Sequence, residues 1–256
     1  MRNDLIEAAL IKLLKAVKKL VTKKDELPLC SAVIVAAGSS MRMGEDKTLM
    51  ELGGVPVLVR TLRAFNDCDS INEIVVVTKA EKLEYIAHLC KLYYITKVTK
   101  VVCGGATRME SSLAGVCACR PMAELVAVHD AARPFVTEEL ISRTVEAAAK
   151  YNAAAPAIAS TDTLKAVDRK GFVLGTVDRN STVRIQTPQI FNADLIKGAL
   201  TRAVEKQLPL TDDCAAMEMM GVKTMIVEGD ENNIKLTTPK DLQLAASIIK
   251  SRGEKL

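Results

Sequence analysis

The stretch Ser31-Ala32-Val33-Ile34-Val35-Ala36-Ala37-Gly38-Ser39-Ser40 decides the fold of this chain of 256 residues. Its apolar run, residues 32–36, has the length of a buried strand, and a turn of small residues follows at once. Comparable apolar runs recur at residues 74–77, 98–103, 125–129 and 154–158, and amphipathic segments at residues 56–65, 82–90, 109–119 and 138–151 separate them. Buried strands that alternate with helices form parallel sheets through right-handed crossovers, so the chain is predicted to be an α/β protein.

The rhythm changes between about residues 160 and 187. The segments 163–167, 172–177 and 183–187 are short and rich in β-branched residues, and turns of Asp-Arg-Lys-Gly and Asp-Arg-Asn separate them. They predict an antiparallel β-arm that leaves the sheet. A late strand over residues 225–228 and a closing helix over residues 239–251 complete the predicted architecture, a Rossmann-like open, mostly parallel sheet flanked by helices.

Residues 1–28 differ from the rest of the chain and are predicted to form an amphipathic helical extension ahead of one domain, residues 29–256. Apolar residues from Leu5 to Val21 recur at helical spacing, with lysines mostly on the opposite face. We expect this extra N-terminal helix to dock on its own domain or on a second subunit. The alternative is a helix that binds a membrane surface or another partner.

The composition favours a soluble protein that handles small anions. Hydrophobic residues make up 49% of the chain and aromatic residues 3%, so the core is aliphatic, as in a parallel sheet buried on both faces. The net charge of +4 is not gathered with aromatic residues into a basic groove, which argues against nucleic acid. No apolar run reaches the ~20 residues of a membrane span. Seven cysteines without a Cys-x-x-Cys pair, with only two histidines, argue against zinc and predict reduced thiols in a cytoplasmic protein.

The loop after the first predicted strand, residues 36–47, is suited to bind a triphosphate. Its small residues let the main chain approach the phosphates, whose oxygens successive N–H groups can then bind. Arg42 and Lys47 add two positive charges in the same place. The loop matches neither the G-x-x-x-x-G-K-[ST] nor the G-x-G-x-x-G pattern. It resembles the signature loop of nucleotidyltransferases that act on sugar phosphates and related anions.

Further blocks resemble one branch of that superfamily, the 2-C-methyl-D-erythritol 4-phosphate cytidylyltransferase family, and the resemblance runs from about Ser31 to the C-terminus. The blocks are Gly104-Gly105-Ala106-Thr107-Arg108 with Ser111, Val128-His129-Asp130-Ala131-Ala132-Arg133-Pro134, Asp162-Thr163-Leu164-Lys165, Thr176-Val177-Asp178-Arg179-Asn180, Gln186-Thr187-Pro188-Gln189, Thr211-Asp212-Asp213 and Asn233-Ile234-Lys235-Leu236-Thr237.

The resemblance implies a reaction in the non-mevalonate isoprenoid pathway. A phosphate oxygen of the acceptor attacks the α-phosphorus of the co-substrate CTP, pyrophosphate leaves, and 4-diphosphocytidyl-2-C-methyl-D-erythritol forms. A phosphate monoester with a second pKa of about 6 is already largely a dianion, so no general base is needed. This agrees with the absence of a Ser/His/Asp or Cys/His arrangement in the motifs.

The resemblance also assigns roles to individual residues. Catalysis falls to Arg42 and Lys47, which face the charge that develops on the α-phosphoryl oxygens. CTP binding falls to Ala36, Ala37, Gly38, Ser39, Gly104, Gly105, Ala106, Ser111, Asp130 and Ala131, and the acceptor's phosphate and alcohol to Arg179, Lys235, Thr187, Arg133 and Thr163. The implied cofactor is Mg²⁺, with Asp130 as the nearest carboxylate or, alternatively, as a residue that orients Arg133 or His129. The implied assembly is a homodimer in which the β-arm reaches into the partner subunit.

Two other functions remain open at this point. Ribitol-5-phosphate cytidylyltransferase shares the fold and the CTP site, although the Ala36-Ala37-Gly38 opening favours methylerythritol phosphate. A non-catalytic nucleotide-binding or interaction module is the second alternative, and the presence of Arg42, Lys47 and Lys235 together argues against it. A third relative within the superfamily is the molybdopterin nucleotidyltransferases, which carry a similar small-residue loop with Arg-Met-Gly and a following lysine.

Overall fold

The computed structural model describes residues 27–38 and 47–253. Nearly all of the expected N-terminal extension, together with Ser39 and Arg42, lies outside these residues. Within them, all five predicted apolar runs are strands of the main sheet; the run at residues 154–158 is β7 (Ala153–Ala159), and the other four form a block of adjacent parallel strands. They are β1 (Cys30–Val35), β4 (Glu73–Thr78), β5 (Val98–Cys103) and β6 (Leu125–Asp130), in the order β6-β1-β4-β5.

The other half of the sheet contains antiparallel strands. β11 (Gln189–Asn192), which the sequence did not predict, lies between β6 and β7 (Ala153–Ala159) and is antiparallel to both. β10 (Val183–Ile185) pairs with β7 on the same side as β11. β12 (Met225–Glu228) pairs with the other side of β7 and runs parallel to it. Val183–Ile185 was expected in the arm, but it pairs with the main sheet, because residues 157–159 of β7 provide backbone partners beyond the end of β11.

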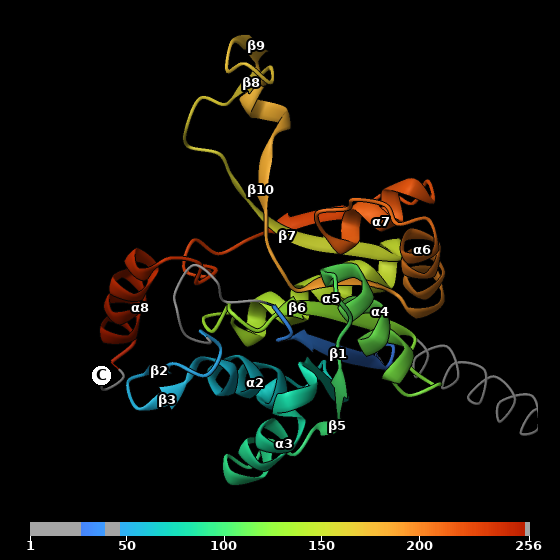
Figure 1. The fold of residues 1–256 in the computed structure, drawn as a ribbon, viewed down its shortest axis with the longest axis vertical. Helices are drawn as coiled ribbons and strands as arrows, with labels where there is room; N and C mark the ends of the chain where they lie inside the picture. Colours follow the sequence, from blue (N-terminus) through green and yellow to red (C-terminus); the bar gives the residue numbers. More distant parts are fainter. Residues whose placement is uncertain (1–26, 39–46, 254–256) are drawn as a thin grey trace, which may run out of the picture.

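Helices cover both faces of the sheet, and each face has its own apolar core (Figure 1). On one face lie α2 (Val57–Asp67), α3 (Leu83–Leu92) and α5 (Glu138–Tyr151). On the other face lie α4 (Arg108–Ala118), α6 (Ala193–Glu205) and α7 (Asp213–Met219). Helices α2, α3, α4 and α5 agree with the predicted segments, whereas α6 and α7 were not predicted.

A third apolar cluster joins the C-terminal helix to a small hairpin. α8 (Pro239–Ser251), which follows the predicted bounds, packs through Ile248 and Ile249 against Leu52 and Phe135. Leu52 belongs to the short hairpin of β2 (Glu51–Leu52) and β3 (Val55–Pro56). This packing brings the loop before α8, which carries Lys235, next to the end of β6.

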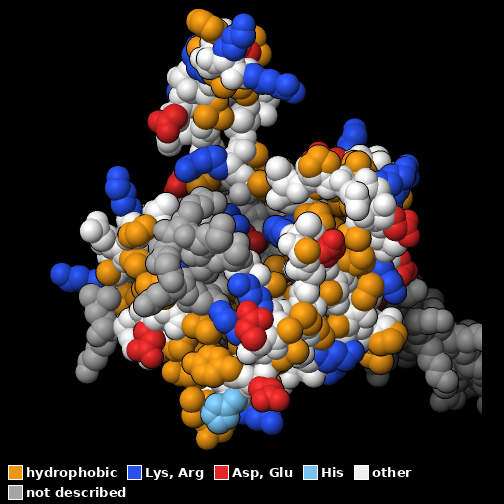
Figure 2. Space-filling model, in the orientation of Figure 1, with side chains coloured by type: hydrophobic (Ala, Val, Ile, Leu, Met, Phe, Trp, Pro, Cys, Tyr) orange, Lys and Arg blue, Asp and Glu red, His pale blue; other side chains and the backbone are white. Residues whose placement is uncertain are grey.

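The β-arm stands clear of the sheet (Figure 1). It consists of the antiparallel pair β8 (Lys165–Val167) and β9 (Val173–Thr176), followed by the short turn Arg179–Ser181. Apolar side chains on it face solvent, among them Phe172, which is 69% exposed, and Leu174, which is 71% exposed (Figure 2). Residues of this kind rarely cluster on a free surface, so the arm has the character of a contact surface.

No helix among the described residues combines the length and the apolar character that crossing a membrane requires.

Candidate functional site

A cavity of about 550 Å³ lies where the four parallel strands end. The loops after β1, β4, β5 and β6 line it, as expected for a ligand site beyond the carboxyl ends of a parallel sheet. Ten of the residues predicted for the site line this cavity: Ala36, Ala37, Gly38, Lys47, Gly104, Gly105, Ala106, Ser111, Asp130 and Lys235. Segments far apart in the sequence therefore meet at the predicted nucleotide site.

Gly104 and Gly105 allow the loop after β5 to fold tightly against the start of α4. A Cβ on Gly104 would lie 2.6 Å from Ser111 Oγ and 2.7 Å from Ala37 Cβ, and a Cβ on Gly105 would lie 2.2 Å from Glu110 Cβ. The Ser111 side chain is buried; its hydroxyl donates to Thr107 O at 2.9 Å and accepts from Gly105 N–H at 3.2 Å. Only glycine therefore permits this approach.

The main-chain N–H of Ala106 is held by the start of α4. Thr107 and Glu110 form a capping box at the start of α4, in which Glu110 N–H donates to Thr107 Oγ1 at 3.1 Å. Glu110 Oε2 in turn accepts the N–H groups of Ala106, at 2.6 Å, and of Thr107, at 3.1 Å. The main-chain donor of Ala106 is already used, which leaves its carbonyl oxygen for a base.

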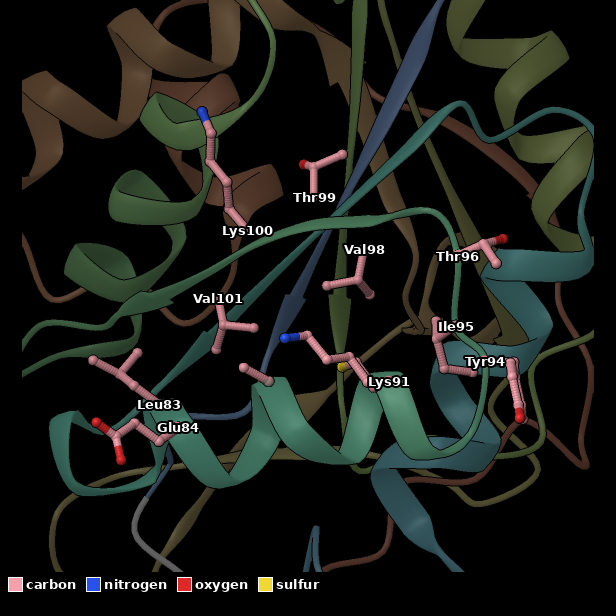
Figure 3. A pocket seen from close by; sticks show the side chains of 12 residues that line it. Leu83, Glu84, Lys91, Tyr94, Ile95, Thr96, Val98, Thr99, Lys100 and Val101 are labelled. Carbon is pink, nitrogen blue, oxygen red and sulfur yellow. The ribbon is translucent and has the colours of Figure 1, made fainter.

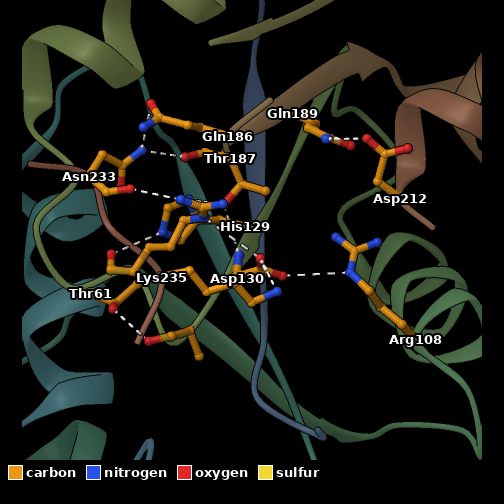
Figure 4. A network of polar contacts seen from close by, with 12 residues as sticks. Thr61, Arg108, His129, Asp130, Gln186, Thr187, Gln189, Asp212, Asn233 and Lys235 are labelled. Carbon is orange, nitrogen blue, oxygen red and sulfur yellow. Dashed lines mark hydrogen bonds and ion pairs between the residues drawn. The ribbon is translucent and has the colours of Figure 1, made fainter. Parts of the chain in front are cut away.

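Asp130, the last residue of β6, is contacted by three cationic side chains within the described part of the chain (Figure 4). Lys235 Nζ lies 2.8 Å and Arg133 Nε 3.7 Å from Asp130 Oδ2, and Arg108 Nε lies 3.6 Å from Oδ1. Burial raises the pKa of the Asp130 carboxyl, but Lys235, Arg108 and Arg133 together lower it by more, so this pKa lies well below its usual value. Asp130 is therefore ionised at every physiological pH.

A buried hydrogen-bond chain fixes the backbone beside Asp130. Burial lowers the pKa of His129 to about 3, so its ring is neutral at neutral pH. Its Nε2 lies 3.3 Å from Arg133 O, which can only accept, so Nε2 carries the hydrogen and Nδ1 accepts. Thr187 Oγ1, at 3.0 Å, must then donate to Nδ1 while it accepts from Asp130 N–H at 3.2 Å. The hydroxyl hydrogen of Thr187 is thus engaged in orienting the end of β6.

Arg108 was not predicted as a site residue, although it stands in the Gly104–Arg108 block. It is the first residue of α4, lines the cavity and contacts Asp130. Its Nη2 also lies 2.7 Å from Oδ2 of the fully buried Asp213. An arginine placed at the start of a helix directly after a glycine-rich loop was the available signal.

The remaining predicted residues fall into three groups. Arg133 and Thr187 contact Asp130 from outside the cavity lining, and Ala131 is buried beside them. Thr163 and Arg179 lie exposed on the arm and do not line the cavity of their own chain. Ser39 and Arg42 lie outside the described residues. The structure thus brings together the residues predicted for CTP but not those predicted on the arm.

A second cavity, of about 600 Å³, lies between α3 and the edge strand β5 (Figure 3). Leu83 and Lys91 from the helix and Val98 and Val101 from the strand line it. It contains none of the predicted site residues, and it lies beside the edge strand rather than beyond the carboxyl ends of the parallel strands. The cavity of about 550 Å³ at the carboxyl ends of the strands is therefore the candidate functional site, although it is the smaller of the two.

Comparison with known proteins points to one family. The family model for 2-C-methyl-D-erythritol 4-phosphate cytidylyltransferase matches residues 30–251. A curated protein of that name from Caldanaerobacter subterraneus subsp. tengcongensis is 43% identical over 218 residues, which are 84% of this chain and 96% of the relative. Another of that name, from Halalkalibacterium halodurans, is 42% identical over 221 residues, covering 86% of this chain and 96% of the relative.

Solved structures agree with the sequence relatives. The crystal structure of 4-diphosphocytidyl-2C-methyl-D-erythritol synthase from Anaerococcus prevotii superposes with a TM-score of 0.79 at 34% identity, covering 87% of this chain and 96% of the other. The crystal structure of 2-C-methyl-D-erythritol 4-phosphate cytidylyltransferase from Thermus thermophilus gives a TM-score of 0.71 at 32% identity, covering 87% of this chain and 99% of the other.

Proposed function

Because the chain belongs to the 2-C-methyl-D-erythritol 4-phosphate cytidylyltransferase family, we propose that it joins 2-C-methyl-D-erythritol 4-phosphate to CTP. The products are 4-diphosphocytidyl-2-C-methyl-D-erythritol and pyrophosphate. One observation carries the proposal beyond family membership: the predicted nucleotide residues meet in one cavity, in which Lys47 and Lys235 lie with the ionised Asp130. Family membership favours this acceptor over ribitol 5-phosphate, and the assembled cationic site argues against a non-catalytic binding module.

The proposed chemistry depends on fixed positive charge. CTP lies along the small-residue loop, with its base toward Gly104, Gly105 and Ser111. Lys47 faces the α-phosphoryl oxygens, whose negative charge grows as the acceptor's phosphate oxygen bonds to the α-phosphorus and the bond to pyrophosphate breaks. Arg42 is assigned the same role from the family resemblance. Lys235 and Arg179 hold the acceptor phosphate, whose charge a lysine and an arginine match well, and Arg133 lies near the alcohol.

Mg²⁺ is the proposed cofactor, and the site offers one carboxylate for it. Asp130 fits this role because it is the one acidic residue among the described lining residues and stays ionised. No group of three or more His, Cys, Asp or Glu that could hold a metal occurs among the described residues, so the triphosphate's own oxygens and water supply most ligands. When bound, the metal neutralises triphosphate charge and polarises the α-phosphorus.

The proposed assembly is a homodimer in which the arm of one subunit completes the site of the other, in the cytoplasm. Two observations support it: the apolar side chains of the arm are exposed, and Thr163 and Arg179 lie away from their own chain's cavity. All seven cysteines are free thiols, which suits a reducing compartment.

Arg179→Ala is expected to raise the KM for the acceptor by roughly 10- to 100-fold, the effect of losing one hydrogen bond to a charged group, and to change the KM for CTP little. Steady-state kinetics with each substrate varied in turn measure this. Arg169→Ala, an exposed arginine between β8 and β9, is the matched control and should leave both values unchanged. Equal effects of Arg179→Ala on both substrates would remove Arg179 from the acceptor site.

Shared sites can be tested by mixing two impaired variants. In a refolded equal mixture of Arg179→Ala and Lys47→Met subunits, about half of the dimers are mixed, and each mixed dimer has one intact site if the arms exchange. About a quarter of all sites are then intact. Activity measured at acceptor concentrations below the KM should therefore recover to about a quarter of the wild-type value. No recovery in a mixture shown to contain mixed dimers would mean that each subunit uses its own arm.

The function itself is tested by pyrophosphate release from CTP with methylerythritol 4-phosphate or ribitol 5-phosphate, each with Mg²⁺ or with EDTA. We expect release with the first acceptor alone, and only with the metal. A preference for ribitol 5-phosphate would show that it is the acceptor. Undiminished activity in EDTA would show that the reaction does not require the metal. Absence of release with both acceptors would favour the non-catalytic alternative.

A further inference from the structure

Asp213 is a fully buried carboxylate with no place in the proposed chemistry. It is the first residue of α7 and comes from the Thr211-Asp212-Asp213 block. Its side chain is 0% exposed, and Oδ2 lies 2.7 Å from Arg108 Nη2. A buried carboxylate costs free energy unless a cation faces it, so the ion pair with Arg108 offsets part of the cost of burying Asp213.

The position of Asp213 is fixed through the main sheet. Gln189, on β11, accepts with Oε1 from the N–H groups of Asp213 and Cys214, each at 3.1 Å. Its Nε2 donates to Asp212 Oδ2 at 2.8 Å (Figure 4). Gln189 pairs in the sheet with Val128, two residues before Asp130. The start of α7 is thereby held at a set distance from the end of β6.

Arg108 connects this anchor to the site. While Nη2 binds Asp213, Nε lies 3.6 Å from Asp130 Oδ1, the oxygen that does not face Lys235. Burial lowers the pKa of Arg108, but Asp213 and Asp130 raise it by more, so the guanidinium stays charged. Asp130 thus lies between two cations, Arg108 on one oxygen and Lys235 on the other.

We propose that Asp213 and Arg108 act together as positioning residues: Asp213 holds the guanidinium of Arg108, and Arg108 sets the orientation of the Asp130 carboxylate. This proposal rests on the proposed function, in which Asp130 serves the metal and Lys235, its ion-pair partner, holds the acceptor phosphate. Without Asp213, Arg108 turns toward Asp130, with which it already forms an ion pair, and pulls it away from Lys235. Without Arg108, Asp130 rotates toward Lys235 and Arg133.

The test uses Arg108→Met, Asp213→Asn and the double variant, each compared with wild type in melting temperature, kcat and KM. Arg108→Met leaves the buried Asp213 without its ion-pair partner, and Asp213→Asn removes the shorter of the two ion pairs of Arg108, so both melting temperatures should fall. The double variant removes both charges, and its melting temperature should return toward wild type. Its kcat should stay reduced by about 10²-fold, the effect of a misplaced site group, with the KM for CTP little changed.

A double variant that regains both stability and kcat would overturn the proposal, because the pair would then serve stability alone. An increase in the KM for CTP with kcat intact in Arg108→Met would also overturn it and make Arg108 a nucleotide ligand. Arg120→Met is the matched control: Arg120 Nε lies 3.4 Å from Oε1 of the buried Glu73, at the amino ends of the parallel strands and so away from the cavity. It should lower the melting temperature without changing kcat or KM.

A second measurement needs no activity and so separates this proposal from the proposed function. Asp213→Asn and Asp130→Asn are combined in a double-mutant cycle of unfolding free energies, since Arg108 contacts both carboxylates. A non-additive double variant supports the link even if wild type releases no pyrophosphate, and strict additivity overturns it.

Discussion

Lys47→Met is expected to lower kcat by roughly 10²- to 10³-fold while the protein stays folded. Lys47 is half-buried and lines the cavity together with Gly38, Gly104 and Asp130. A fixed cation that faces the developing charge stabilises the transition state more than the bound substrate, so kcat should fall further than the KM for CTP rises. Single-turnover measurements with saturating CTP isolate this step from product release.

Lys47→Arg and Lys91→Met are the matched variants for this measurement. Lys47→Arg keeps the positive charge but carries it on a planar guanidinium instead of a compact ammonium group. It should therefore retain part of the rate that Lys47→Met loses. Lys91, an exposed lysine in the second cavity, should be replaceable by Met without effect. A Lys47→Met enzyme with normal kcat and a raised KM for CTP would show that Lys47 only binds the nucleotide.

Asp130→Asn is expected to lower the free energy of unfolding by about 2 kcal/mol and kcat by roughly 10²-fold. The loss leaves Arg108, Arg133 and Lys235 without the carboxylate that they share. Breaking a fully buried pair costs ~3–5 kcal/mol, but Lys235 is 39% exposed and water screens part of its charge. Urea unfolding of both proteins at neutral pH measures the difference.

The pH dependence of this stability difference follows from the direction of the pKa shift. The folded-state pKa of Asp130 lies below the unfolded value of about 3.9, so its stabilisation is complete above that value. It is lost as the pH falls through the folded pKa. The difference between wild type and Asp130→Asn should therefore be constant from about pH 8 to about pH 5 and shrink only below about pH 4. A difference that vanishes by pH 5 would contradict the cationic cluster around Asp130.

The parallel half of the sheet and the nucleotide cavity could be predicted from the sequence, because their signals are local. Runs such as residues 32–36 and 74–77 are apolar over the length of a strand, and the loops that follow them supply the small residues. The family resemblance assigned the site residues on these loops, and their meeting agrees with the rule that ligands bind beyond the carboxyl ends of parallel strands. Family membership then confirmed the proposed class of reaction.

In the other half, the sequence predicted β7 and β12 but neither β11 nor the pairing of β10 with the main sheet. β11 is four residues long and is a strand because β6 and β7 offer backbone partners on both sides. Val183–Ile185 has the composition of the arm, yet it belongs to the main sheet for the same reason. Short β-branched segments become strands where the tertiary context supplies a partner.

By itself, the sequence determined the four parallel strands and the helices between them, the small-residue loop and ten of the residues that line the cavity. Tertiary structure alone decided how the charges are connected. His129 and Thr187, separated by 58 positions, belong to one hydrogen-bond chain. Arg108 forms ion pairs with both Asp213 and Asp130 and so connects these two carboxylates. The physical reason is range: hydrophobic periodicity and turn chemistry act over a few residues, whereas ion pairs and buried hydrogen bonds depend on which distant segments pack together.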